Sequence, residues 1–313
     1  MKLRMWAALI AVYIVWGSTY LAIRFAVESM PPFLMASFRF LLAGAILYTW
    51  RRMQGDERPA FRHWRSAAIV GAFLIVGGNG NVVWAEQRVV SGIAALIIGT
   101  EPLWIVVIDS LLPGGRRPGF WAIVGVVIGF IGIAVLIGPS QLTGMSGEVD
   151  LIGAGALLLA AFLWSVGSLY NRGADLPGSP LLGTSMEMLF GGAMLLVLGT
   201  ATGEWGRLDL AAIEPRAWLG LVYLIVFGSL VGFVSYTWLL RVAPTPLVST
   251  YAYVNPLVAI FVGNWLAAEP LTPRVLAAAA IIVGAVVLIT VTQARSSRQG
   301  KPAKAPVYSG GDD

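Results

Sequence analysis

The chain of 313 residues contains no cysteine. Disulfide bridges, cysteine-metal sites and thiol nucleophiles are therefore excluded, and the redox environment is not indicated. Histidine is nearly absent as well. His63, the one histidine, lies in the arginine-rich segment RRMQGDERPAFRHWR, where we expect a solvated loop position. General acid–base catalysis is short of side chains, so we expect no metal, no cofactor and no enzyme activity.

Charged side chains are also scarce. They make up 12% of the residues and hydrophobic side chains 58%, whereas soluble domains contain roughly 25% charged residues. Such a chain cannot cover itself with polar surface. The net charge of +5 is spread between apolar runs, which indicates membrane topology and no nucleic-acid partner.

Long apolar runs are abundant, and about 20 residues are enough to cross a bilayer. They predict an all-α membrane protein with ten spans. The basic and apolar N-terminus lacks a signal-peptide cleavage site, so we expect an uncleaved first span. The spans are predicted at 5–25, 33–50, 65–84, 90–111, 119–138, 151–171, 180–202, 217–240, 245–266 and 273–293.

Lys and Arg are concentrated in the segments that lie on the same side as the N-terminus. The positive-inside rule then places both termini in the cytoplasm, as an even number of spans requires. Residues 294–313 are polar and rich in Pro and Gly, which predicts a disordered cytoplasmic tail. We expect a multi-pass protein of a bacterial inner membrane.

An internal repeat divides the chain into residues 5–138 and 151–293, with five spans each. It consists of two series of identities, each at its own constant offset: Trp16, Leu21 and Arg24 with Trp164, Leu169 and Arg172, then Trp84, Pro102 and Leu103 with Trp238, Pro256 and Leu257. Because five is odd, the halves must be inserted in opposite senses. Secondary transporters have this inverted-repeat organisation, with the site at mid-membrane where helices break.

The fourth and ninth spans contain corresponding polar-proline pairs, Glu101-Pro102 in TEPLW and Asn255-Pro256 in VNPLV. Each pair is near the expected midplane of the bilayer. Proline frees a carbonyl one turn earlier, and a freed carbonyl is tolerated only against protein or a wet cavity. We predict a shared central site, with Glu101 binding a cationic group or a coupling proton, Asn255 donating or accepting hydrogen bonds, and both prolines acting as hinges.

Two further charged residues lie within spans. Arg39 is at a depth from which it could pair with Glu101, and Glu187 could pair with Arg172. A carboxylate or guanidinium at this depth usually faces the bundle interior and serves function. A purely structural ion pair is the alternative for each, and we keep Arg39 with Glu101 among the substrate-binding candidates.

Several aromatic and amide side chains complete the candidate site. Asn79 and Asn81 lie in GGNGN, which no strand precedes; we expect this segment to bend or unwind the third span, leaving both amides for substrate or backbone. Ring faces together with Glu101 favour cationic or amphipathic solutes, although each ring could equally pack or face lipid. The aromatic candidates are Trp16, Tyr20, Trp84, Trp164, Tyr170 and Tyr251.

The segments YIVWGSTYLAIRFAVESMPPFLMASFRFLLAG, GNGNVVWAE, SGIAALI, STYAYVNPL and AAEPLT resemble the EamA-type transporters of the drug/metabolite transporter superfamily. The resemblance covers residues 6–293 and looks closest to bacterial inner-membrane exporters. It implies a cavity lined by spans one, three, four, six, eight and nine, and export of amino acids or other small metabolites. One departure is LPGGRRPG after span four, which lacks the acid that the second half keeps as Glu269-Pro270; we expect that acid to be structural.

The sequence therefore predicts an alternating-access exporter of small metabolites, amphipathic compounds or drugs. Its partners would be the solute, a coupling proton and membrane lipid. The alternatives are a membrane-embedded enzyme, a non-transporting scaffold and a channel, and the pair of mid-membrane prolines argues against the last two. A homodimer is left open, as are the solute and the coupling ion.

Overall fold

The computed structural model describes residues 2–112, 118–137, 150–243, 245–248 and 250–299, and these segments are helical, without a β-strand among them. Runs of Leu, Ala, Ile and Val give helices here because a helix satisfies its own backbone hydrogen bonds, as a chain in lipid must. The elements are α1 (Lys2–Val27), α2 (Pro32–Met53), α3 (Phe61–Gly71), η1 (Ala72–Gly80), α4 (Asn81–Ala85), α5 (Ser91–Ile98), α6 (Glu101–Leu111), α7 (Phe120–Ile137), α9 (Leu151–Asn171), α10 (Pro180–Ala201), η2 (Glu204–Arg207), α11 (Pro215–Tyr223), η3 (Leu224–Val231), α12 (Gly232–Val242), α13 (Thr245–Val248), α14 (Tyr251–Ala267) and α15 (Pro273–Gln299).

Nine helices in the described part of the chain are long and apolar enough to cross a membrane. They agree with nine of the ten expected spans to within a few residues. The expected ninth span is different, because it consists of the short helix α13 followed by α14, whose 17 residues fall just below spanning length. The total of ten and the cytoplasmic termini stay predictions.

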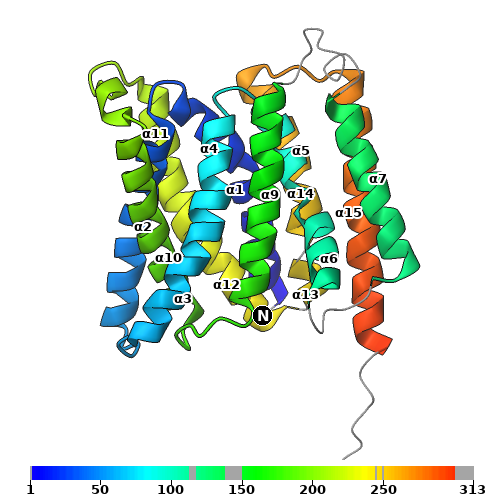
Figure 1. The fold of residues 1–313 in the computed structure, drawn as a ribbon, viewed down its shortest axis with the longest axis horizontal. Helices are drawn as coiled ribbons and strands as arrows, with labels where there is room; N and C mark the ends of the chain where they lie inside the picture. Colours follow the sequence, from blue (N-terminus) through cyan, green and yellow to red (C-terminus); the bar gives the residue numbers. More distant parts are fainter. Residues whose placement is uncertain (1, 113–117, 138–149, 244, 249, 300–313) are drawn as a thin grey trace, which may run out of the picture.

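The helices form a bundle in which α2, α3 and α10 lie at one edge and α7 packs along α15 at the other (Figure 1). Between these edges α1, α5, α9 and α14 make up the centre (Figure 1). The last helix, α15, continues to Gln299, which corrects the expectation that disorder begins at 294. The segment ARSSRQ contains good helix formers, so the helix extends beyond its apolar part. Residues 300–313 lie outside the described part.

Helices α2 and α10 pack together through reciprocal contacts. A Cβ on Gly44 would lie 3.1 Å from Cγ of Leu189, and a Cβ on Gly192 would lie 3.0 Å from Cγ of Leu41. Gly44 and Gly192 are mates in the sequence repeat, and so are Leu41 and Leu189. A pair of contacts exchanged in this way requires two antiparallel helices related by a local two-fold axis.

The same symmetry relates two acidic residues that approach helix N-termini. The carboxylate of Glu204 accepts the backbone amides of Phe33 at 3.3 Å and Leu34 at 2.9 Å, in the first turn of α2. Its repeat mate Asp56 interacts with Ser179, the residue before α10. Asp56 also accepts two hydrogen bonds from Arg51, at 2.8 and 2.6 Å. These bonds hold the pKa of Asp56 below its ordinary value, and burial opposes them.

Two wide turns occur at related places in the two halves. The third span contains the π-helix η1 (Ala72–Gly80), and the eighth span contains the π-helix η3 (Leu224–Val231). π-Helices are rare and are often found at functional sites. Each changes the angular position of every side chain that follows it along its span.

Candidate binding cavity

A small cavity of about 30 Å³ lies where the two halves meet. Its lining comes from α1, from both helices of the fourth span and from α14: Tyr20, Ala95, Ile98, Gly99, Glu101, Pro102, Tyr251, Ala252, Asn255 and Pro256. This volume accommodates a water molecule but no metabolite in the present conformation. The structure thus brings together Glu101, Asn255, Tyr20, Tyr251 and both prolines, which the sequence had placed in one site.

The fourth span breaks beside this cavity. Helix α5 ends at Ile98, α6 begins at Glu101, and Thr100 between them donates its backbone amide to the carbonyl of Ile97 at 3.1 Å. Pro102 occupies the first turn of α6, where a missing amide is tolerated. Glu101 is therefore at the electropositive N-terminus of α6, which favours a negative charge there. Arg172, at the end of α9, is the cationic side chain whose charge acts on Glu101.

The ninth span corrects the prediction of two symmetric breaks. Helix α14 begins at Tyr251 and continues through Asn255 and Pro256 to Ala267, so the chain is helical where its mate is broken. One feature is nevertheless shared. Proline cannot donate to the carbonyl four residues earlier, and these carbonyls belong to Ile98 and Ala252, which both line the cavity.

Asn255 has an unused polar atom in this position. Its side chain is 8% exposed, and Oδ1 has no hydrogen-bond partner among the described residues. Buried polar atoms normally have a partner because an unmade hydrogen bond costs about 1–3 kcal/mol. An acceptor in this state beside a cavity is suited to a donor on a bound molecule.

Aromatic rings form the wall next to Tyr251. The rings of Trp16, Tyr236 and Tyr251 contact one another, with centroid distances of 5.1, 5.4 and 5.6 Å. Trp16 also donates Nε1 to the carbonyl of Gly228 in η3 at 3.2 Å. Trp16 therefore lies behind the cavity wall and supports Tyr251 rather than lining the cavity itself.

The remaining aromatic candidates lie elsewhere. Trp84 lines a separate cavity between α2, α4 and η2, with the guanidinium of Arg88 5.0 Å from its ring centroid. Trp164 packs on Gly78, where a Cβ would lie 2.5 Å from Cε3 of the indole. Tyr170 is 40% exposed near the end of α9. The structure does not bring these three rings into the central cavity.

The two asparagines of GGNGN bind their own helix. Asn79 Nδ2 donates to the carbonyl of Leu74 at 3.3 Å, and Asn81 Nδ2 donates to that of Gly77 at 2.7 Å. Of the two roles that the sequence left open, the structure has the backbone one. The span is widened into a π-helix here rather than unwound.

Arg39 and Glu187 have partners that the sequence did not indicate. Arg39 is 4% exposed and donates Nε to Ser229 Oγ at 3.0 Å. Its guanidinium is subject to the charge of Glu86, and no ion pair with Glu101 occurs among the described residues. Glu187 accepts Nδ2 of Asn171 at 3.2 Å instead of pairing with Arg172.

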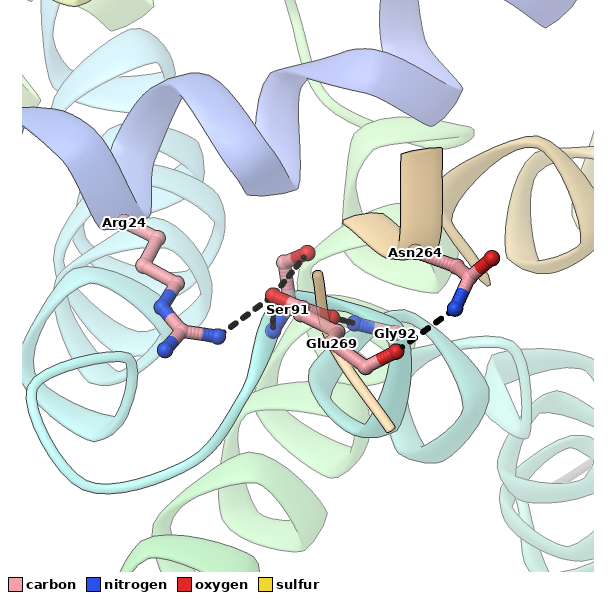
Figure 2. A network of polar contacts seen from close by, with 5 residues as sticks. All are labelled: Arg24, Ser91, Gly92, Asn264 and Glu269. Carbon is pink, nitrogen blue, oxygen red and sulfur yellow. Dashed lines mark hydrogen bonds and ion pairs between the residues drawn. The ribbon is translucent and has the colours of Figure 1, made fainter. Parts of the chain in front are cut away.

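A polar cluster surrounds Glu269 at the start of α5 (Figure 2). Glu269 accepts the backbone amide of Ser91 at 2.9 Å, its hydroxyl at 2.8 Å and the amide of Gly92 at 3.0 Å. Arg24 of α1 forms an ion pair with the same carboxylate at 2.5 Å. We call these four residues, Arg24, Ser91, Gly92 and Glu269, the latch. It joins the two halves, because Glu269 follows α14 in the second half while α1 and α5 belong to the first.

The turn after α14 directs Glu269 into this cluster. Ala268 has the left-handed φ of 51°, which ends α14, and the backbone amide of Glu269 donates to the carbonyl of Gly263 at 3.1 Å. Asn264 Nδ2 donates to the Glu269 carbonyl at 2.9 Å. A carboxylate on the first amides of a helix is the arrangement that the helix dipole favours.

Sequence reasoning overlooked Glu86. It directly follows α4 in the sequence, where a charged side chain is ordinarily solvated, yet it is only 4% exposed. Neither carboxylate oxygen has a hydrogen-bond partner among the described residues. Its place at the end of a long apolar run was the one available signal.

The fold and the cavity define a class: a polytopic helical membrane protein with a two-fold repeat and a polar site between its halves. The comparisons identify the family. The EamA-like transporter family matches residues 4–138 and again residues 151–291. The chain belongs to this family and is an EamA-type transporter of the drug/metabolite transporter superfamily.

Relatives include the inner membrane transporter YedA of Escherichia coli K12, 38% identical over 307 residues that cover 97% of this chain and 96% of YedA. A WAT1-related chloroplastic protein of Arabidopsis thaliana is 25% identical over 288 residues, 91% of this chain and 69% of that protein. The chain is a multi-pass protein of the bacterial inner membrane.

A solved crystal structure of another protein has a similar fold, with a TM-score of 0.63 and 21% sequence identity. The match covers 93% of this chain and 97% of the other. At this identity the likeness concerns the fold alone. Membership of the family implies transport of a small-molecule solute.

Proposed function

We propose that the protein exports small amphipathic or cationic metabolites, amino acids or drugs across the inner membrane by alternating access. The observation that supports this most strongly is the position of the cavity between the halves, with Glu101 on one wall and the unpartnered Asn255 Oδ1 on the other. A site between two related halves becomes accessible to each side in turn when the halves rock against one another.

The chemistry of the lining favours a particular solute class. Glu101 provides a carboxylate for an ammonium group or a coupling proton, and Asn255 provides an amide for hydrogen bonds. Tyr20 and Tyr251 provide ring faces for apolar or cationic parts. Most ligand sites have this composition, with apolar walls and a few convergent polar groups.

The prolines have separate roles in this mechanism. Pro102 is beside the break of the fourth span, and Pro256 is within α14. Because neither donates a backbone hydrogen bond, each lowers the cost of bending its span. The cavity must enlarge to accept a solute, and we assign these two positions as the hinges of that movement.

Transport can be tested before the solute has been identified. Amines, amino acids and aromatic cations are screened for those that raise the melting temperature of the purified protein, because ligands of the folded state stabilise it by mass action. Each hit is then assayed for counterflow in proteoliposomes. We expect accumulation of labelled solute driven by unlabelled solute inside the vesicles.

The alternative functions give different results. A scaffold would give no counterflow, a channel would give equilibration without accumulation, and an enzyme would return a chemically altered solute. Any of these outcomes, obtained with a solute that stabilises the protein, would contradict the proposed function.

A further inference from the structure

Glu86 is a buried acid that the proposed transport mechanism does not use, and its carboxylate differs from those of the other buried acids in its lack of hydrogen bonds among the described residues. Its carboxyl group lies near the backbone amide of Arg24, but neither oxygen makes a hydrogen bond within the described residues. A carboxylate anion in this state would be costly, because burial removes its hydration and no hydrogen bond replaces it. The neutral acid avoids that cost.

Charged groups surround Glu86 on several elements. Arg24 on α1, Arg39 on α2 and Glu269 after α14 all act on its charge, and Tyr20 on α1 is subject to the charge of Glu86. The nearby α9 end contributes Asp150, which pairs with Arg88 at 3.8 Å. Burial and Glu269 raise the pKa of Glu86 well above its ordinary value, and the two arginines oppose that shift.

Both arginines whose charges act on Glu86 already have other partners. Arg24 is held by Glu269 in the latch at 2.5 Å, and Arg39 is bonded through Nε to Ser229. One nitrogen of Arg39, Nη1, has no partner in the described part of the chain. An ionised Glu86 would attract both the unpartnered Nη1 of Arg39 and the guanidinium of Arg24, and so would compete with Glu269 for Arg24. A neutral Glu86 would leave Arg24 in the latch.

We propose that Glu86 is a proton-binding site that controls the latch: the protonated acid keeps Arg24 on Glu269, and the ionised carboxylate draws Arg24 away and loosens the latch. The proton comes from the aqueous phase and adds to one carboxylate oxygen, and it returns there on release. Gln87 and Arg88, the next two residues, are exposed, so water is close to the site.

This site is distinct from Glu101 in the cavity. The two acids share one neighbour, because the charges of both Glu86 and Glu101 act on Tyr20. The latch holds the start of α5, and α5 contributes Ala95, Ile98 and Gly99 to the cavity. Proton binding at Glu86 would thus regulate access to the cavity. This regulation rests on the proposed function in one respect, namely that the latch closes the path of a transported solute.

Proton binding is tested first, on the purified full-length protein without any solute. Infrared difference spectra between acidic and alkaline pH record the carbonyl band of each carboxylic acid that loses its proton. We expect Glu86→Gln to lack one such band while Glu86→Asp retains it at a shifted pH. Glu187→Gln is the matched control, a buried acid with a hydrogen-bond partner. Spectra of Glu86→Gln that match the wild type would overturn the proposal.

The latch is tested by thiol labelling, which the cysteine-free chain allows without background. Ala252→Cys places one thiol on the cavity wall, and a membrane-impermeant maleimide is applied to right-side-out vesicles. Rates are divided by those of the unfolded protein at each pH to remove the titration of the thiol. We expect labelling to rise at least about fivefold from acidic to alkaline pH, the usual lower range of coupling between sites.

The variants separate the outcomes. With Glu86→Gln, labelling should stay at the slow acidic rate at every pH, and with Glu269→Gln it should be fast at every pH. Glu187→Gln should follow the wild type. A wild-type protein that labels equally at both pH values, or a Glu86→Gln protein that keeps the wild-type change, would overturn control of the latch. Neither readout needs a solute, so either failure is separable from a failure of transport.

Discussion

The two halves of the molecule treat the same proline in opposite ways. In the first half the span is broken immediately before Pro102, and Glu101 lies at the new helix N-terminus. In the second half α14 continues through Pro256, and Asn255 is buried within it. The repeat thus supplies two related positions at one cavity. The position in the broken span carries the acid Glu101, and the position in the continuous helix carries the amide Asn255.

This difference has a physical reason. A carboxylate is stabilised by the free amides of a helix N-terminus, which only a broken span provides in the middle of a bundle. An amide side chain needs no such stabilisation and is compatible with an unbroken helix. We therefore expect the half with the acid to be the half in which the chain opens.

The largest effect is expected where the halves touch. A Cβ on Gly99 would lie 2.9 Å from Cγ of Pro256, so Gly99→Val forces the broken span away from α14. We expect loss of counterflow and a loss of unfolding free energy of about 1–3 kcal/mol, typical of overpacking. Gly155→Val is the control, because nothing lies within 4 Å of that exposed glycine of α9. Equal behaviour of the two variants would show that the halves need not approach here.

The prolines should respond unequally to the same substitution. Pro256→Ala restores an amide that can bond the carbonyl of Ala252, so we expect a stiffer α14, a melting temperature that is unchanged or higher, and counterflow reduced by about tenfold, or about 1.4 kcal/mol in barrier. Pro102→Ala changes a first-turn position and should alter counterflow by less than about twofold. The reverse order of the two rates would show that the fourth span needs Pro102 in order to bend, and would contradict a break that lets the span bend without it.

The cavity lining from the repeat mates was predictable, because two polar-proline pairs at one depth, in spans related by the repeat, are expected to face the same central space. The directions in which the candidate side chains of the third and sixth spans point were not predictable. Asn79 lies within η1 and Asn81 directly after it, and a wide turn rotates every later residue away from the face that a regular helix would give it. The position of the Trp164 ring is determined by the space that Gly78 leaves for it. No pattern in a single sequence indicates this packing contact.

The sequence indicated which charged residues lie within spans, but not which residues they interact with. Arg39 was expected near Glu101 by depth, yet it is bonded to Ser229 on η3, because depth fixes one coordinate and helix rotation the others. Glu86 was overlooked because it follows the last apolar residue of its span, where a charged side chain is ordinarily solvated. The chain around it folds inward against α1 and α2, which no local pattern indicates.

A moderate effect is expected at Glu269, the residue that the second half contributes to the latch. A Cβ on Gly263 would lie 2.5 Å from Oε2 of Glu269, so Gly263→Ala should displace the carboxylate and lower the unfolding free energy by about 1 kcal/mol. Gly284→Ala in α15 has open space around it and should instead stabilise by up to about 1 kcal/mol through helix propensity. Thermal melts of the two variants measure the difference, and a stabilised Gly263→Ala protein would refute the crowding.

The smallest effect compares the acids at the N-termini of α2 and α10. Glu204→Gln, in a fully buried site, should cost about 1 kcal/mol, and Asp56→Asn at most about 0.5 kcal/mol. The pKa of Asp56 is lowered by Arg51, so its contribution is present above the ordinary carboxyl pKa of about 4 and is lost as the pH falls through the lower, folded value. Melting temperatures of wild type and Asp56→Asn should differ at neutral pH and converge in strong acid. A difference that persists in acid would contradict the charged pair.

The role of Glu101 can be tested most directly by counterflow of a cationic solute found in the stabilisation screen, measured in proteoliposomes for the wild type, Glu101→Gln and Glu187→Gln. If Glu101 is the charged wall of the shared cavity, Glu101→Gln folds normally and loses more than about tenfold of the transport rate, equivalent to about 1.4 kcal/mol, while Glu187→Gln remains close to the wild type. Unchanged transport and unchanged pH dependence in Glu101→Gln would contradict that role.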